Sequence, residues 1–145
     1  MVTKRIFLSG ALASVGGALA VLDADGARAQ TRKANAMGSV VIQDISLGEV
    51  KAGLADGSIV LIDIREKNEW DAGRIPGALF NPLSAFDVNK LPPAAPGKKI
   101  VLYCRSGNRS KTALAQAQAQ GRGDVVTHYA GAMLEWQAAG EKVER

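Results

Sequence analysis

Two nearly continuous apolar runs stand out in the hydrophobic pattern, at residues 59–64 and 100–103. A parallel strand that is covered on both faces has this continuous pattern, whereas a half-exposed strand alternates apolar and polar residues. We therefore expect both runs to form buried strands. Shorter apolar runs predict three further strands, at residues 40–42, 78–80 and 125–129.

Segments with helical patterns separate these runs. Ser46 and Glu49 form a capping box, which predicts a helix from that point to about residue 55. Residues 109–120 are rich in Ala and Gln and have high helix propensity, and residues 132–139 predict a last helix that Gly140 ends. Buried strands that alternate with helices indicate an α/β domain with a mainly parallel sheet.

The first 29 residues have the pattern of a secretory signal peptide. Lys4 and Arg5 precede an uncharged stretch over residues 6–22, and residues 27–29 have the small-x-small form after which a signal peptidase cuts. The alternative is a membrane anchor, but the stretch is at the short limit for spanning a bilayer and contains glycines. We expect cleavage after Ala29.

This prediction sets the domain organisation and the location of the protein. Residues 1–29 are the signal peptide, residues 30–39 a flexible leader and residues 40–145 a single domain in the periplasm or outside the cell. Residues 3–8 also resemble a twin-arginine signal in which Lys4 replaces the first arginine. The Sec and Tat routes therefore both stay open.

Composition excludes several other classes of protein. The chain has 145 residues, of which 47% are apolar and 22% charged, so it fits one globular domain and is not disordered. One cysteine excludes a disulfide scaffold, and 16 glycines exclude a coiled coil. A net charge of +4 with 5% aromatic residues does not indicate a nucleic-acid partner, and we expect no membrane association once the signal peptide is removed.

The single cysteine, Cys104, follows the predicted strand 100–103 directly. In an oxidising compartment it has no partner within its own chain, so it must stay free, pair with another molecule or react. A buried free cysteine is most often a small apolar core residue. The loop that follows Cys104 favours a reactive one.

That loop has the features of an anion-binding site. Ligands bind at the carboxyl ends of parallel strands, and a strand-to-helix loop directs backbone N–H groups and the helix N-terminus towards them. Arg105 and Arg109 add two positive charges, Gly107 permits a tight turn, and Ser106 and Asn108 offer small polar side chains. A thiol in this setting ionises readily to the nucleophilic thiolate.

The length of the loop distinguishes between two thiolate chemistries. From Cys104 to Arg109 the pattern is C-x4-R, one residue shorter than the C-x5-R loop with which cysteine phosphatases encircle a phosphate. A narrower ring suits the sulfur of a persulfide better than the three oxygens of a phosphoryl group.

The chain resembles the rhodaneses, which are single-domain sulfurtransferases, over almost all of the predicted domain. Residues 61–66, 69–70 and 73–78 are similar to the upstream signature of the family, and residues 100–110 resemble its active-site strand and loop. Residues 129–131, with the following Trp and Gly, resemble its closing G-G…W…G element. The departures from the family pattern are Arg74 for His, Trp70 for Tyr or Phe, and Ala130 for Gly.

The resemblance implies a rhodanese-like α/β fold, with a five-stranded, mainly parallel sheet flanked by helices on both faces. It also implies a two-step reaction. The Cys104 thiolate takes the outer sulfur of a donor such as thiosulfate, and a thiophilic acceptor (cyanide, a thiol or a reduced redox protein) then removes it. The substrate-binding residues would be Arg105, Ser106, Gly107, Asn108 and Arg109. No metal or organic cofactor is needed, because the cysteine itself carries the sulfur.

Other polar residues have a structural interpretation. Asp63 and Arg65 end the neighbouring strand and could reach the loop, but we expect Asp63 to accept backbone N–H bonds and Arg65 to pair with a carboxylate. Ser110 is a supporting residue of the loop. His128, the only histidine, could donate a proton to a leaving group, although no motif surrounds it. We expect Trp70 and Trp136 to be core or pocket-wall residues.

Two alternative functions stay open. A phosphatase or an arsenate-type reductase would use the same thiolate, and hydrolysis of a phosphate ester would favour it. A binding module of the same fold would deliver or sense a persulfide without multiple turnover, and function retained in a Cys104→Ser variant would favour that alternative.

Overall fold

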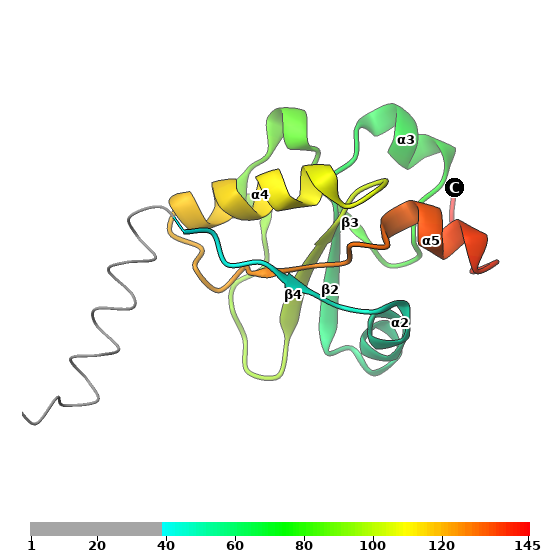
Figure 1. Cartoon of the computed structure of the whole chain (residues 1–145), viewed down its shortest axis with the longest axis horizontal. Coiled ribbons are helices and arrows are strands. Elements are labelled where there is room, and N and C mark those ends of the chain that lie inside the picture. The colour runs from blue at the N-terminus through cyan, green and yellow to red at the C-terminus, as the bar shows by residue number, and fades with distance from the viewer. Residues whose placement is uncertain (1–38) are drawn as a thin grey trace, which may run out of the picture.

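The computed structural model describes residues 39–145, and in it five strands form one sheet in the order β1-β5-β4-β2-β3 (Figure 1). All four strand pairings are parallel. The predicted α/β fold with a five-stranded parallel sheet is therefore confirmed. The strands are β1 (Gln43–Asp44), β2 (Ile59–Asp63), β3 (Leu79–Phe80), β4 (Lys99–Tyr103) and β5 (Thr127–His128).

Helices cover both faces of this sheet. They are α2 (Leu47–Asp56), α3 (Lys67–Ala72), α4 (Asn108–Ala119) and α5 (Ala132–Ala138), with two 3-10 turns, η1 (Leu83–Ala85) and η2 (Val88–Lys90). Successive side chains of a strand point to opposite faces. Leu102 of β4 accordingly packs with Leu114 of α4, whereas its neighbour Val101 packs with Val50 of α2 and Trp136 of α5. The central strands are thus buried on both sides, as their apolar runs predict.

The capping box of α2 forms as predicted. The backbone N–H of Glu49 donates to Ser46 Oγ over 3.2 Å, and the backbone N–H of Ser46 donates to Glu49 Oε2 over 2.7 Å. Gly57 ends the helix with a φ of 78°, a left-handed conformation in which glycine carries no steric penalty.

The prediction of the first strand is wrong. Residues 40–42 pair with no strand, and the side chains of Val40 and Ile42 are 41% and 43% exposed. The side-chain amide of Gln118 binds Val41 instead, since its Oε1 accepts from Val41 N and its Nε2 donates to Val41 O. Pairing with β5 begins one residue after the apolar run, at Gln43.

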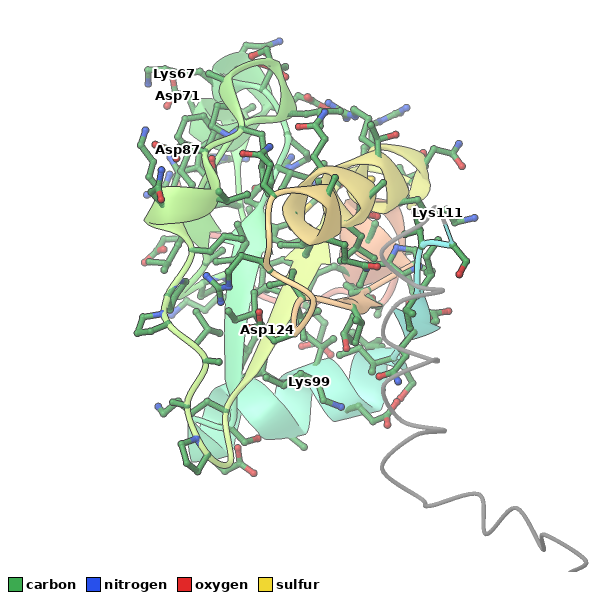
Figure 2. All side chains as sticks on the ribbon, turned by 90° about the vertical axis from the view of Figure 1, so that its left-hand side faces the viewer. Lys67, Asp71, Asp87, Lys99, Lys111 and Asp124 are labelled. Carbon is green, nitrogen blue, oxygen red and sulfur yellow. The ribbon has the colours of Figure 1, made fainter. Side chains whose placement is uncertain are left out.

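Helix α3 is absent from the sequence-based prediction. Its six residues are too few for an amphipathic pattern, and none is buried. A second capping box holds it: Glu66 N donates to Glu69 Oε2 over 3.0 Å, and Glu69 N donates to the Glu66 carbonyl over 3.0 Å. Figure 2 shows Lys67 and Asp71 of α3 at one end of the molecule and Lys99, the first residue of β4, towards the other.

The predicted signal peptide (residues 1–29) and nearly all of the predicted leader (30–39) lie outside the described residues, and export stays a prediction. From residue 39 onwards, no helix combines the length and the hydropathy that crossing a bilayer requires.

Candidate active site

The candidate site begins where β4 ends. Cys104 directly follows Tyr103, the last residue of that strand, and is only 1% exposed. The chain then turns through the loop and enters α4 at Asn108, with Gly107 as the residue before the first turn. The structure thus places the predicted nucleophile between the carboxyl end of a buried strand and the N-terminus of the 12-residue helix α4.

Two polar groups lie near the cysteine sulfur, one from the loop and one from the first turn of α4. The backbone N–H of Gly107 donates to Cys104 Sγ over 3.0 Å. Ser110 Oγ lies 3.7 Å from the same sulfur and accepts from the thiol. When the sulfur is an anion, it can only accept, so the Gly107 N–H supports the charge directly and the serine hydroxyl is within reach.

Gly107 is required by its conformation and by a close contact. Its φ is 93°, and a Cβ at this position would lie 2.8 Å from the carbonyl oxygen of Ala130. Any side chain would push the loop away from the segment before α5. The glycine that the sequence analysis places in a tight turn therefore also lets its own N–H reach the sulfur.

Helix α5 fixes the start of the loop from the other side. The backbone N–H of Met133 donates to the Cys104 carbonyl and that of Leu134 to the Arg105 carbonyl, both over 3.1 Å. Ala132 precedes them with a φ of 55°, and it is the one non-glycine residue with positive φ in the described part of the chain. The positive φ thus falls on Ala132, two residues after Ala130, the alanine that stands where the family pattern has glycine.

Arg109 forms a bidentate ion pair with a residue from another helix. Its Nη1 lies 2.7 Å from Glu69 Oε2, and its Nη2 lies 2.8 Å from Glu69 Oε1. The hydrogen bonds from Arg109 lower the pKa of Glu69 to about 2, against the opposing effect of burial. The pKa of Arg109 is raised, first by Glu69 and to a smaller extent by the nearby Cys104.

The remaining loop residues differ in their exposure. Arg105, Ser106 and Asn108 are exposed, whereas Gly107 and Ser110 are buried. Because both terminal nitrogens of Arg109 face Glu69, the exposed Arg105 is the more accessible charge of the two. That these residues hold the oxygens of a donor stays a prediction.

Asp63 and Arg65 form a buried pair at the end of β2. Arg65 Nη2 lies 2.7 Å from Asp63 Oδ2 and donates to the Gly73 carbonyl over 2.7 Å. Asp63 also accepts from the backbone N–H of Arg65 over 2.9 Å and from the Tyr103 hydroxyl over 2.6 Å. These are the structural roles expected from the sequence. The carboxylate of Asp63 and the guanidinium of Arg65 bind each other and neighbouring groups at the end of β2.

Ser110 connects the loop to β5. Its hydroxyl donates to the Gly107 carbonyl over 2.9 Å, and its Oγ lies 2.8 Å from His128 Nδ1. His128 is 2% exposed, and burial lowers its pKa. Sequence reasoning missed this contact, because the two residues are 18 positions apart on different elements and no local motif joins them.

The two tryptophans have different environments. Trp136 is 5% exposed in the core between α5 and the sheet, and its Nε1 donates to the Lys142 carbonyl. Trp70 is half-buried, lies 5.0 Å from the Phe80 ring and carries the guanidinium of Arg74 over its own ring at 4.4 Å. The arginine that replaces the usual histidine therefore packs on Trp70.

A pocket of about 470 Å³ lies at the opposite end of the sheet. It is lined by the first residues of β2 and β4, Ile59 and Lys99, and by Glu49 and Asp56 from α2. Neither cysteine nor histidine is among the residues that line it, and the candidate nucleophile lies in the loop around Cys104. No group of three or more His, Cys, Asp or Glu side chains in residues 39–145 is placed to hold a metal ion.

Comparison with known proteins identifies the family of this chain. A family model described as a rhodanese-like domain matches residues 46–139. An uncharacterised protein of Synechocystis is 40% identical over 83 residues, which are 57% of this chain and 45% of that protein. The human thiosulfate:glutathione sulfurtransferase is 33% identical over 105 residues, covering 63% of this chain and 90% of that enzyme.

The solved structure of a human single-domain sulfurtransferase matches with a TM-score of 0.55 and 29% sequence identity, over 70% of this chain and 97% of the human one. The resemblance found in the sequence is therefore confirmed by an independent family match and by structure. The family match runs from the N-cap of α2 to the C-cap of α5 and covers well over half of the residues. The chain belongs to the rhodanese-like domain family.

Proposed function

We propose that this protein is a sulfurtransferase that moves a sulfane sulfur from thiosulfate, or a donor of the same kind, to a thiophilic acceptor through a persulfide on Cys104. The observation that carries the proposal is the Gly107 N–H, which donates to Cys104 Sγ over 3.0 Å inside a loop of C-x4-R length. The family and the printed activity of the human relative support it.

The first step charges the cysteine. The Cys104 thiolate attacks the outer sulfur of thiosulfate, a new S–S bond forms at Sγ, and sulfite leaves with the electron pair of the old S–S bond. Donors preorganised around the sulfur stabilise the anion without reorganisation during the reaction. Arg105 is an exposed residue of the loop, and in this proposal its guanidinium binds the sulfonate oxygens of the donor.

The second step discharges the cysteine. An acceptor nucleophile attacks the outer sulfur of the persulfide and forms a bond to it, and the Cys104 thiolate leaves with the electrons of the S–S bond. Cyanide gives thiocyanate, and a thiol gives a new persulfide. No oxidant or reductant enters the cycle, since the sulfur is transferred between two nucleophiles.

Intact mass spectrometry of the full chain before and after thiosulfate tests the proposal. We expect one added sulfur atom on the wild type, none on Cys104→Ser, and loss of that sulfur on addition of cyanide or a thiol. If the folded wild type stays unchanged with thiosulfate and also with a small-molecule persulfide, the sulfurtransferase proposal is wrong. A phosphate-ester assay would then test the phosphatase alternative.

A second measurement separates an enzyme from a delivery module. With the protein at about one hundredth of the donor concentration, an enzyme forms thiocyanate far beyond one equivalent. A module without turnover stops near one equivalent.

Two residues should slow the first step when they are replaced. They are Ser110, which lies behind the loop, and Arg105, which lies at its surface.

We also propose that residues 1–29 direct export of the protein and that it acts in the periplasm or outside the cell. The charged start, the uncharged stretch and the small-x-small site support this. The mass of the protein recovered from the periplasm or the medium tests it: a chain that begins at Gln30 is expected, and a full-length cytoplasmic chain would contradict export.

A further inference from the structure

His128 is a buried, titratable group that the two-step reaction does not use. It is 2% exposed, and it ends β5, the strand next to β4 in the sheet. Its Nδ1 lies 2.8 Å from Ser110 Oγ, and Ser110 Oγ lies 3.7 Å from Cys104 Sγ. A continuous chain of polar atoms therefore connects the imidazole to the candidate nucleophile.

The contacts of Ser110 determine how this chain is protonated. The hydroxyl has one proton, and its contact with the Gly107 carbonyl at 2.9 Å requires that proton, because a carbonyl oxygen can only accept. The contact with His128 must then be formed by a proton on Nδ1, with the imidazole as donor and the serine oxygen as acceptor. The Nδ1–H tautomer of His128 satisfies both contacts.

Ionisation of the cysteine changes what is required of Ser110. The thiol donates to Ser110 Oγ, but the thiolate and the persulfide anion can only accept. Because Ser110 Oγ accepts from His128, the contact with the imidazole does not use the serine proton, which can turn from the Gly107 carbonyl to the sulfur. The sulfur anion would then have a hydroxyl donor in addition to the Gly107 N–H.

We propose that His128 is a positioning residue for sulfur transfer: through its Nδ1–H it orients Ser110 so that the hydroxyl donates to the Cys104 thiolate. This inference rests on the proposed function for its biological meaning. Its physical content, a hydrogen-bond chain that favours the thiolate, does not depend on the identity of the donor or the acceptor.

The charges around this chain are consistent with a neutral imidazole. Burial is the main cause that lowers the pKa of His128, Asp44 of β1 raises it, and Lys111 of α4 lowers it. Lys111 is exposed and lies at the outer side of α4 in Figure 2. All of the variants below keep Arg105 and Arg109, the charged residues of the loop. Differences in alkylation between the variants therefore measure the effect of the hydrogen-bond chain.

The test is the pH dependence of alkylation of the full chain by iodoacetamide, with no sulfur donor present. His128→Leu removes the donor, whereas the amide nitrogen of His128→Asn can take the place of Nδ1. We expect the pH at which alkylation is half-maximal to rise by about one unit in His128→Leu, which slows alkylation roughly tenfold at lower pH. In His128→Asn it should stay close to the wild-type value.

A double variant shows whether the effect passes through Ser110. Ser110→Ala should raise the same midpoint, and adding His128→Leu to Ser110→Ala should produce no further rise, because the connection is already broken. If His128→Leu does not fold, His128→Gln, whose amide replaces Nε2 instead of Nδ1, takes its place.

Two results would overturn the proposal: a wild-type midpoint in folded His128→Leu or His128→Gln, or an unchanged effect of His128→Leu in the Ser110→Ala background. Alkylation needs no sulfur donor. The alkylation midpoints would therefore still test the role of His128 if the sulfurtransferase proposal failed. Conversely, a normal persulfide on wild type with no midpoint change in the variants would reject only the role of His128.

Discussion

The neighbouring central strands β2 and β4 end in two clusters of polar side chains with opposite properties. At the end of β2, the carboxylate of Asp63 binds the guanidinium of Arg65 and the hydroxyl of Tyr103, all of them buried. At the end of β4, a backbone N–H donates to Cys104 Sγ, and the side chain of Arg105 is exposed. The first cluster is closed, whereas the second has groups left for a ligand.

The difference shows that position in the fold does not by itself identify a chemical site. Polar residues gather at the carboxyl ends of parallel strands, where ligands usually bind. In the β2 cluster, however, each partner is satisfied within the protein, and this is the state that buried charges require for stability. The experiments below separate a stabilising cluster from a reactive one.

The largest effect on stability is expected for Asp63→Ala. This variant leaves Arg65 buried without its carboxylate, which should lower the free energy of unfolding by about 3–5 kcal/mol. Urea unfolding measures it. At a temperature where the variant is still folded, persulfide formation per folded molecule should stay within a few-fold of the wild type, in contrast to its complete loss in Cys104→Ser.

The matched control for this variant is Asp71→Ala. Lys67 and Asp71 form an exposed ion pair at 2.9 Å on α3, labelled in Figure 2. Exposed pairs contribute at most about 1 kcal/mol. If Asp63→Ala lowers the free energy of unfolding no more than Asp71→Ala does, the β2 cluster does not stabilise the end of that strand. The contrast between a stabilising and a reactive cluster would then be wrong.

A smaller effect is expected for the ion pair between Arg109 and Glu69 beside the loop. The folded protein lowers the pKa of Glu69 from 4.5 to about 2, so the carboxylate contributes stability above about pH 4.5 that is lost as the pH falls towards 2. Both side chains are partly exposed, so we expect a contribution of about 1 kcal/mol. Glu69→Gln should flatten this part of the curve of unfolding free energy against pH.

Glu49→Gln is the control for the Glu69 experiment. Glu49 completes the capping box of α2 and Glu69 that of α3, and glutamine serves in such a box as well as glutamate. Of the two, Glu69 is the one whose carboxylate pairs with an arginine. If the two variants flatten the acid side of the curve equally, the pair with Arg109 adds nothing beyond the cap.

The smallest effect is expected for Ala132→Gly, next to the loop. Relief of a left-handed alanine gains about 1–2 kcal/mol. Loss of the buried methyl group and the greater chain entropy of glycine offset most of that gain. Thermal unfolding should therefore show a change of less than about 0.5 kcal/mol, whereas Ala138→Gly, in ordinary helical backbone, should cost about 1 kcal/mol. Equal costs for the two would show that Ala132 carries no strain.

Local patterns predicted the parts of the fold that depend on neighbouring residues. The capping box at Ser46 and the two buried strands follow from spacing and from apolar runs, and both are as expected. The predicted strand at residues 40–42 was wrong because an apolar run at the edge of a sheet does not determine which residues pair with the neighbouring strand. Helix α3 is held by its cap and carries no buried face, so periodicity could not detect it.

The sequence could predict the position of the reactive loop, but not most of its contacts. Cys104, Gly107 and the helix that follows are local, and the family resemblance adds the chemistry. The partners Glu69 of Arg109 and His128 of Ser110 are 40 and 18 residues away. Such pairs depend on how the strands are ordered in the sheet, which a single sequence does not specify.

The burial of Cys104, with 1% of its surface exposed, has a consequence for which molecules it can meet. Two copies of the protein could join through a disulfide only if their Cβ atoms came within about 4 Å of each other. Two sulfur atoms as deeply buried as this one cannot approach each other so closely, so we expect no cross-link between copies even where disulfides form freely. We expect the same burial to favour reaction with a small anion or a small thiol over reaction with the flat surface of another protein. A protein partner would have to present its sulfur on an extended, protruding segment.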